Sequence, residues 1–307
     1  MTAGRGSREV LPDVTIVIPT TGGPTLAGCL DSIAAGTRWP ARLIVVDQGR
    51  SEAVAERIGA LRRMGLDAVH VPSTGRGISA ATNLGLERTR TELVAITHDD
   101  CVVRPTWLDG LVASLTRHAA DLGDAIVTGR VEPEGDGIVL TVRTDDRPAI
   151  HRSPGLTRDV LFPPNMGFAI RLLEVVGPFD EHPSLATAGE DNEWAHRALR
   201  AGVPIVYDPS VAVGHLARHR PADLAGLYRR YARGQGAFYG TWLRRGDLLI
   251  ALRVLRDLVR APWLVARGAF TRNDELLAMG RAELTGLLPG ILAGLRNRGT
   301  RPTRGRG

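Results

Sequence analysis

Two adjacent carboxylates, Asp99 and Asp100, are the side chains in this sequence best placed to do chemistry. They follow a short apolar run with β-branched residues, 93–96, which predicts a buried strand. Because neighbouring carboxylates repel each other and are costly to desolvate, a positive partner is expected, either a hard divalent cation or arginine. A divalent cation carried on a substrate diphosphate would neutralise both carboxylates. The open alternative is a solvated turn whose aspartates cap a helix near 105–107.

The elements that must position this pair alternate between strands and helices. Strands are predicted at 14–18, 43–47, 68–71 and 93–96, and helices at 25–33, 51–64 and 78–88. This alternation of near-continuous apolar strands with helices indicates a parallel α/β sheet. Ligands bind such sheets beyond the carboxyl ends of the strands, where Pro19, Asp47 and the two aspartates all fall. No G-x-G-x-x-G or Walker loop is present, which argues against a dinucleotide oxidoreductase or a P-loop enzyme.

The second half of the sequence contains another acidic pair, Glu190 and Asp191, which opens a predicted helix ending at Arg200. Acidic residues in a first helical turn favour the helix dipole, so capping is the structural alternative to a chemical role. Further strands are predicted at 125–131, 161–170, 203–207 and 211–215, with a loop or hairpin over 135–154. The last of these strands ends with His215, and a lone histidine after a strand is usually structural.

Composition sets weaker bounds. The 307 residues are 43% hydrophobic and 23% charged, which is ordinary for a globular protein. All 39 basic residues are arginine, and the formal net charge is +6. Arginine binds phosphate in bidentate fashion, which fits an anionic ligand or membrane surface, although codon bias would give the same composition. Cys29 and Cys101 lack metal-binding spacing and no secretory signal opens the chain, so a reduced cytosolic protein is expected.

The C-terminal region, 220–295, is predicted to be a basic amphipathic helical extension. Helices are expected at 224–242, 247–270 and 275–295, with arginine and aromatic residues interleaved in the first two. Such helices either lie on an anionic membrane or pack on the preceding domain with solvated arginines. No stretch approaches the roughly 20 uninterrupted apolar residues of a span, so an integral protein is not expected. Residues 1–12 are expected to be flexible, and 296–307 to be a disordered basic tail.

Seven segments, in order, resemble those of glycosyltransferase family 2, the inverting GT-A type nucleotide-sugar transferases. They cover roughly 14–215 and read VTIVIPT, LIVVDQGRS, GRGISAATNLGL, ITHDDCVVRPTWL, NMGFAI with GPFDE, GEDNEW, and YDPSVAVGH. The resemblance implies a Rossmann-like, mostly parallel sheet flanked by helices over 13–219. Nucleotide-sugar binding would lie in its first half, and the acceptor and base in its second.

The resemblance also implies roles on the donor side of the reaction. Pro19 and Thr20 would line the nucleoside site, and Asp47 would hydrogen-bond the base. Arg76 and Asn83 would face the nucleotide and its diphosphate. The expected donor is a UDP-, dTDP- or GDP-sugar.

The two acidic pairs receive different roles from the same resemblance. Asp99 and Asp100 would hold Mg²⁺ or Mn²⁺ on the diphosphate, with His215 completing the metal shell. Asp191 would be the general base that takes the acceptor proton, with Glu190 beside it. A cation would neutralise the charge that develops on the leaving diphosphate. The expected acceptor is a hydroxyl on a lipid-linked or cell-envelope glycan, or on a small metabolite; nucleic acid is not expected.

The sequence departs from the family pattern at two positions. His98 stands where many members have a further aspartate, and Thr82 replaces an arginine that often precedes the asparagine of the third motif. The processive Q-x-x-R-W signature is absent, which favours addition of a single sugar. A nucleotidyltransferase and a non-catalytic nucleotide-sugar or membrane-surface binding protein remain alternatives. The expected location is cytoplasmic or peripheral at the inner face of the cell membrane.

Overall fold

The computed structural model describes residues 8–156, 159–186, 188–217 and 219–297. These residues form two compact units. The first, which we call the sheet unit, comprises the described residues within 1–151, 161–173 and 203–217. The second, the helical unit, comprises those within 152–160, 174–202 and 218–307. Residues 1–7 of the flexible N-terminus predicted over 1–12, and residues 298–307 of the tail predicted over 296–307, lie outside the described residues.

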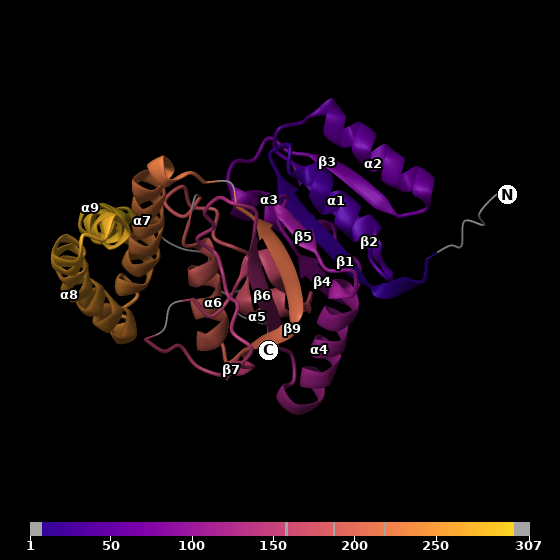
Figure 1. The fold of residues 1–307 in the computed structure, drawn as a ribbon. Helices are drawn as coiled ribbons and strands as arrows, with labels where there is room; N and C mark the ends of the chain where they lie inside the picture. Colours follow the sequence, from indigo (N-terminus) through magenta and orange to yellow (C-terminus); the bar gives the residue numbers. More distant parts are fainter. Residues whose placement is uncertain (1–7, 157–158, 187, 218, 298–307) are drawn as a thin grey trace. The chain divides into compact units, whose positions relative to one another are not determined.

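The sheet unit contains one mixed sheet with helices beside it (Figure 1). The strand order is β3-β2-β1-β4-β8-β6-β9-β5, and β7 pairs with β9. In chain order the elements are β1 (Val10–Thr20), α1 (Leu26–Ala34), β2 (Trp39–Asp47), α2 (Glu52–Met64), β3 (Ala68–Pro72), α3 (Ile78–Arg88), β4 (Leu93–Ile96), β5 (Cys101–Val103), α4 (Trp107–Leu122), β6 (Ile126–Glu134), β7 (Ala149–His151), β8 (Met166–Ala169) and β9 (Ile205–Leu216).

The N-terminal part of the sheet is parallel, because β1 lies between β2 and β4 and β3 pairs with β2 in the same direction. Strand β8 then enters antiparallel to both β4 and β6. The apolar runs of the central strands explain their position: Ile16, Ile18, Leu43 and Val45 are at most 1% exposed. Strands covered on both faces need such runs, and the predicted α/β class is confirmed.

Two sequence expectations about the sheet unit were wrong. Residues 10–12, expected to be flexible, belong to β1, where Val10 is aligned with Trp39 of β2. The two strands predicted at 203–207 and 211–215 are one strand, β9. The strand continues through the residues between them, which were expected to separate two strands. There the Asp208 carboxylate accepts hydrogen bonds from the Ser210 backbone N–H and hydroxyl, at 3.0 and 2.6 Å. The pairing of β9 with β6 shifts register at this point.

The helical unit is built from α6 (Glu190–Arg200), α7 (Leu224–Leu243), α8 (Leu248–Thr271) and α9 (Asp274–Arg296). The short helix α5 (Leu172–Val176) crosses the division between the two units. Phe238, Tyr239, Ile250 and Leu287 are among the residues of the apolar core formed by α7, α8 and α9. We expected α6 to belong to a catalytic domain ending at 219, but it falls in the same compact unit as the C-terminal helices.

Helices α7 and α9 approach so closely that their backbones touch. A Cβ atom on Gly240 of α7 would lie 2.1 Å from the Ile291 carbonyl oxygen. On α9, a Cβ atom on Gly290 would lie 2.1 Å from the Arg233 carbonyl oxygen, and one on Gly294 only 2.0 Å from that of Ala237. Small residues four apart permit this kind of contact, so α9 is tied to α7 along its length.

Among the described helices, α9 alone is long and apolar enough to cross a membrane by length and composition. Its most apolar window has a mean hydropathy of 1.3, and 33% of that window is buried within the protein. No such stretch was predicted from the sequence, because Arg281 and Glu283 interrupt the apolar run of α9.

Candidate active site

The pairing of β5 with β9 brings Asp100 and His215 together from positions far apart in the sequence. Cys101, the first residue of β5, is aligned with His215 on β9. Asp100, which directly precedes β5, therefore lies beside the histidine, and its Oδ2 atom is 3.2 Å from His215 Nε2. The Asp100 side chain is 6% exposed and that of His215 is 14% exposed. The sheet thus brings a buried carboxylate oxygen and a partly buried imidazole nitrogen together at one edge.

Cys101 adds a third potential metal ligand, since one ligand atom each from Asp100, Cys101 and His215 lies within 4.8 Å of the others. Burial raises the pKa of the Cys101 thiol well above its usual value, and the nearby Asp100 carboxylate adds to this. A neutral thiol is a poor ligand for a hard cation. The carboxylate that remains suits Mg²⁺ or Mn²⁺, and the imidazole nitrogen favours Mn²⁺ of the two; water and a diphosphate would fill the other positions.

Asp99 is oriented by the end of β1. The Thr20 hydroxyl donates a hydrogen bond to Asp99 Oδ2 at 2.6 Å and accepts one from the Gly22 N–H at 2.9 Å. The threonine therefore links the turn after β1 to the turn after β4. Pro19 is buried beside it on β1. The roles of Pro19, Thr20 and Asp99 in ligand binding stay predictions. In addition, the hydrogen bond between Thr20 and Asp99 holds the two turns together.

Asp47 is fully buried at the end of β2. One carboxylate oxygen accepts a hydrogen bond from the Gly49 N–H at 2.8 Å, and the other accepts one from the Ser51 N–H at 2.7 Å. His70 Nε2 on β3 lies 3.0 Å from the second oxygen. These contacts make Asp47 the residue that shapes the loop after β2. His70 was not among the site residues predicted from the sequence.

Gln48, also missed, fixes the loop that carries Arg76. Its side-chain amide donates to the carbonyl oxygens of Gly75 and Gly77 at 2.9 and 3.0 Å. Arg76 between them is exposed, whereas Asn83 on α3 is 5% exposed. A polar residue directly after a strand in an α/β sheet is the signal that would have identified Gln48.

In the helical unit, the first turn of α6 presents Glu190 and Asp191. Gly189 precedes it with a φ of +90°, a conformation that favours glycine. A Cβ atom at this position would also lie 2.5 Å from the Gly234 carbonyl oxygen of α7. Next along α6, the Asn192 amide donates to Gln235 Oε1 at 3.2 Å. Glycine thus lets the acidic turn lie directly against α7.

The protonation of the two carboxyl groups is shaped by their crowded surroundings. Desolvation raises the pKa of Glu190 to about 8, and the charge of Asp191 adds to the rise. Desolvation raises the pKa of Asp191 to about 6, with a contribution from Asp159 and a partial offset by the Asn192 N–H. Within the described residues, Glu190 Oε2 has no hydrogen-bond partner. The two raised pKa values indicate that the pair shares one proton near neutral pH, and we assign this proton to Glu190, whose pKa is raised further.

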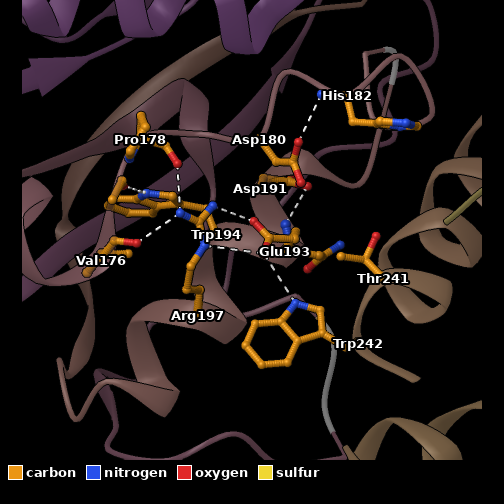
Figure 2. A network of polar contacts seen from close by, with 12 residues as sticks. Val176, Pro178, Asp180, His182, Asp191, Glu193, Trp194, Arg197, Thr241 and Trp242 are labelled. Atoms are coloured by element: carbon orange, nitrogen blue, oxygen red, sulfur yellow. Dashed lines mark hydrogen bonds and ion pairs between the residues drawn. The ribbon is translucent and has the colours of Figure 1, made fainter. Parts of the chain in front are cut away.

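A buried ion pair anchors α6 behind this turn (Figure 2). Arg197 pairs with Glu193 at 2.5 Å, and the exposed fraction of each side chain is at most 2%. Arg197 also donates to the carbonyl oxygens of Val176 and Pro178 at 2.8 and 2.7 Å. The Trp242 indole N–H donates to Glu193 Oε1 at 3.2 Å. The charges of both partners are thus hydrogen-bonded inside the helical unit.

The GPFDE and GEDNEW segments meet in the same network. Trp194 stacks on Phe179 with ring centroids 4.7 Å apart and donates its indole N–H to the Gly177 carbonyl oxygen at 2.9 Å. Asp180 accepts a hydrogen bond from the side-chain amide of Asn297, at the end of α9, at 2.8 Å. These contacts give GPFDE, one of the segments that carry the family resemblance, a packing role in the helical unit.

The predicted site residues therefore fall into two sets. Those assigned to the donor and the metal lie in the sheet unit, where Asp100 meets His215 and Asp99 meets Thr20. The acidic pair assigned to the base, Glu190 and Asp191, lies in the helical unit.

Comparison with solved structures defines the class of fold. The mannosyltransferase PcManGT from Pyrobaculum calidifontis, solved with GDP-Man and Mn²⁺, superposes with a TM-score of 0.61 at 16% identity. The match covers 96% of this chain and 89% of that one. Residues 1–349 of TarS from S. aureus, solved with UDP-GlcNAc, superpose with a TM-score of 0.51 at 13% identity, covering 89% and 90% of the two chains. The fold is therefore of the GT-A type.

The sequence profile of the family described as "Glycosyl transferase family 2" matches residues 15–171, and the chain belongs to this family. It is 27% identical over 296 residues to a pre-mycofactocin glycosyltransferase of Mycobacterium tuberculosis. That match covers 92% of this chain but only 57% of the relative's length. The glycosyltransferase AglE of Haloferax volcanii is 26% identical over 217 residues, covering 68% of this chain and 69% of AglE.

Proposed function

We propose that this protein transfers one hexose from a nucleoside diphosphate sugar to an acceptor hydroxyl, with inversion at the anomeric carbon. The observation that carries the proposal is the 3.2 Å approach of Asp100 to His215, which a sheet of the GT-A type creates from two distant segments. Family membership supports the reaction class. The donors bound by the structural neighbours, GDP-Man and UDP-GlcNAc, support a nucleotide-sugar donor.

On the donor side, Asp100 and His215 would hold the divalent cation, with Asp99 nearby. When bound, the cation would neutralise the charge that develops on the leaving diphosphate. The Asp47–His70 contact and the two hydrogen bonds of Gln48 hold the loops after β2 and β3 in shape. Preformed loops reduce the ordering cost of binding a nucleotide.

On the acceptor side, Asp191 would take the proton from the attacking hydroxyl. A base works best when its pKa lies near the working pH, and burial moves the pKa of Asp191 up to about 6. Glu190 stays protonated at neutral pH, so the turn carries one negative charge instead of two. The single charge keeps Asp191 the only base of the pair.

The acceptor class is proposed from the relatives. One acts on pre-mycofactocin, and another is the O-antigen chain rhamnosyltransferase RfbN of Salmonella typhimurium, 23% identical over 288 residues. RfbN is matched over 87% of its length by 86% of this chain. A hydroxyl on a small metabolite or on a cell-envelope or lipid-linked glycan suits both names. The missing Q-x-x-R-W segment supports a single addition.

Two alternative functions are less well supported. A nucleotidyltransferase normally has a basic, glycine-rich loop after its first strand, whereas the residues directly after β1 read TGGPT and contain no basic side chain. A non-catalytic nucleotide-sugar binding protein has no need for a carboxyl whose pKa is moved toward neutrality, as that of Asp191 is.

The test is a panel of nucleoside diphosphates and nucleotide sugars, each added with Mn²⁺, Mg²⁺ or chelator while the melting temperature is followed. A ligand that binds the native state raises this temperature by mass action. We expect one uridine, thymidine or guanosine series to stabilise only with metal, and its sugar to be transferred to a hydroxyl acceptor. Stabilisation that is equal in chelator would contradict the metal assignment, and no stabilisation by any member would contradict the nucleotide-sugar donor. Stabilisation without transfer to any hydroxyl acceptor would favour the non-catalytic alternative.

A further inference from the structure

The outer face of α8 is apolar over its whole length. The most exposed large side chains are Leu248 at 79%, Val259 at 66% and Phe270 at 90%. Of all exposed residues on this helix, only Arg267 and Thr271 are polar. The exposed apolar residues, which we call the α8 stripe, are Leu248, Ala251, Leu252, Leu255, Leu258, Val259, Pro262, Trp263, Ala266, Ala269 and Phe270.

The neighbouring helix α9 adds a second exposed row. Leu284, Leu288, Leu292 and Leu295 follow one another at helical spacing and are 44%, 52%, 60% and 40% exposed. The glycine contacts between α9 and α7 hold this helix in the bundle. Because α9 is packed against α7, these leucines are exposed on the outer side of a helix that belongs to the bundle.

The charges of α8 separate from the stripe. Its one acid, Asp257, is 1% exposed and accepts hydrogen bonds from the Tyr239 hydroxyl and the Arg256 guanidinium, each at 2.8 Å. Its remaining ionisable residues are all arginine. The Arg267 guanidinium lies 5.0 Å from the centre of the Trp263 ring, so a cation and an indole sit together at the border of the stripe.

We infer that the α8 stripe, with the leucine row of α9, lies in the surface of an anionic membrane and holds the enzyme there as a peripheral protein. A helix of 24 residues is roughly 36 Å long, too extensive an apolar face to be left in water. A typical protein interface includes a polar rim and about ten direct hydrogen bonds, whereas lipid needs none, and Arg267 and Thr271 are the only exposed polar side chains on this helix. Arginine beside the stripe complements anionic headgroups.

The same helix is built to lie on the membrane and not to cross it. Its opposite face carries Arg253 and Asp257, which are 4% and 1% exposed inside the helical unit. Arg253 donates to the Gly155 carbonyl oxygen at 2.8 Å. Because those polar groups have partners within the protein, only the stripe is available to lipid.

The test measures binding of the full chain to vesicles of equal parts phosphatidylglycerol and phosphatidylcholine, by flotation at low salt. The variant Leu255→Gln/Val259→Gln/Trp263→Gln removes three exposed apolar side chains without touching the core. Its matched control is Val10→Gln/Met64→Gln/Ile150→Gln, which replaces residues that are 47%, 54% and 45% exposed in the sheet unit. Circular dichroism and melting temperature establish that both variants fold.

We expect the wild type and the control to float with the vesicles and the α8 variant to bind about a hundredfold more weakly. Arg267→Gln should weaken binding to the anionic vesicles and leave the weaker binding to pure phosphatidylcholine unchanged. Binding by the α8 variant equal to wild type would overturn the inference, as would the absence of wild-type binding.

The alternative to a membrane is that a second copy of the chain covers the α8 stripe. Light scattering distinguishes the two. A wild type that is dimeric, does not float, and becomes monomeric in the α8 variant would overturn the membrane assignment. Binding is measured without donor or acceptor. A negative result therefore leaves the transferase proposal standing, and failure of the donor panel leaves this inference standing.

Discussion

This protein contains two pairs of neighbouring carboxyl groups, and the surroundings of each pair give it a different chemistry. Asp99 and Asp100 follow a strand, where one contacts a hydroxyl and the other lies 3.2 Å from an imidazole nitrogen. Glu190 and Asp191 begin a helix in crowded surroundings that raise both pKa values. The first pair is suited to hold a cation and the second to exchange a proton, because ligand donors surround one and desolvation governs the other.

Replacement of the base should have the largest effect. For Asp191→Asn we expect the transfer rate to fall by about a thousandfold to ten-thousandfold, because the acceptor proton loses its carboxylate. Donor affinity should stay within a factor of about two to three, since that affinity is assigned to the sheet unit. Rates with saturating donor and calorimetric donor binding measure the two effects. Unchanged turnover would remove Asp191 from the mechanism and end the comparison.

The wild-type rate should also fall as the pH drops below about 6, because Asp191 is then protonated. The Asp191→Asn variant has no carboxyl to titrate at this position, so its residual rate should lose that acid limb. A variant that keeps the same acid limb would assign it to another group.

The buried ion pair between Arg197 and Glu193, which anchors the helix carrying the second acidic pair, can be tested by substitution. Arg197→Met leaves the Glu193 charge buried without its partner, so we expect a loss of about 3–5 kcal/mol in the free energy of unfolding. Arg57→Met, which breaks the exposed pair with Asp31, is the matched control and should cost at most about 1 kcal/mol. Denaturant unfolding measures both. Equal losses would show that the buried pair is not what anchors α6.

These two regions also differ in how far the sequence predicts them. The parallel part of the sheet follows from apolar runs separated by helical periodicity, and each of its four strands was found. The Asp100–His215 contact was predicted only from the family resemblance. It depends on the antiparallel pairing of β5 with β9, and a strand of three residues is too short for hydrophobic periodicity to predict its pairing.

The setting of the acidic turn on α6 was harder still to predict. The acidic residues and glycine of GEDNEW suggested a helix start, but the close contact of Gly189 with Gly234 joins residues far apart in the sequence. The pKa shifts arise mainly from desolvation, to which Asp159 adds for Asp191 and the neighbouring Asp191 adds for Glu190, so the motif alone encodes only the last of these contributions. The exposed face of α8 was likewise visible as an amphipathic pattern, but which face is buried is set by α7 and α9.

Removal of the metal carboxylate should have a smaller but specific effect. Asp100→Asn is expected to lower the rate by about a hundredfold to a thousandfold and to raise the Mn²⁺ concentration needed for half-maximal activity. Titration of activity with Mn²⁺ at saturating donor measures both. Asp99→Asn is the matched comparison: its hydrogen bond with Thr20 predicts a weaker shift in Mn²⁺ dependence. An unchanged Mn²⁺ titration in Asp100→Asn would contradict the cation assignment.

Glu190→Gln should have the smallest effect on rate and the most informative dependence on pH. Glu190 is a carboxylic acid at neutral pH, so its amide changes the rate by less than about tenfold there. Above pH 8 the wild type gains a second charge beside Asp191 and the variant does not, so the alkaline part of the two rate profiles should separate.

Stability gives an independent view of the same carboxyl. Its pKa is raised by folding from 4.5 to about 8, so the native state holds this proton more tightly than the unfolded chain. The free energy of unfolding should therefore fall as the pH rises from about 4.5 to 8 in the wild type. The Gln variant should keep only the part of this fall below about pH 6 that the raised pKa of Asp191 causes. Melting curves across that range measure it. Parallel curves would mean that Glu190 is ionised in the native state, and the contrast between the two acidic pairs would then rest on Asp191 alone.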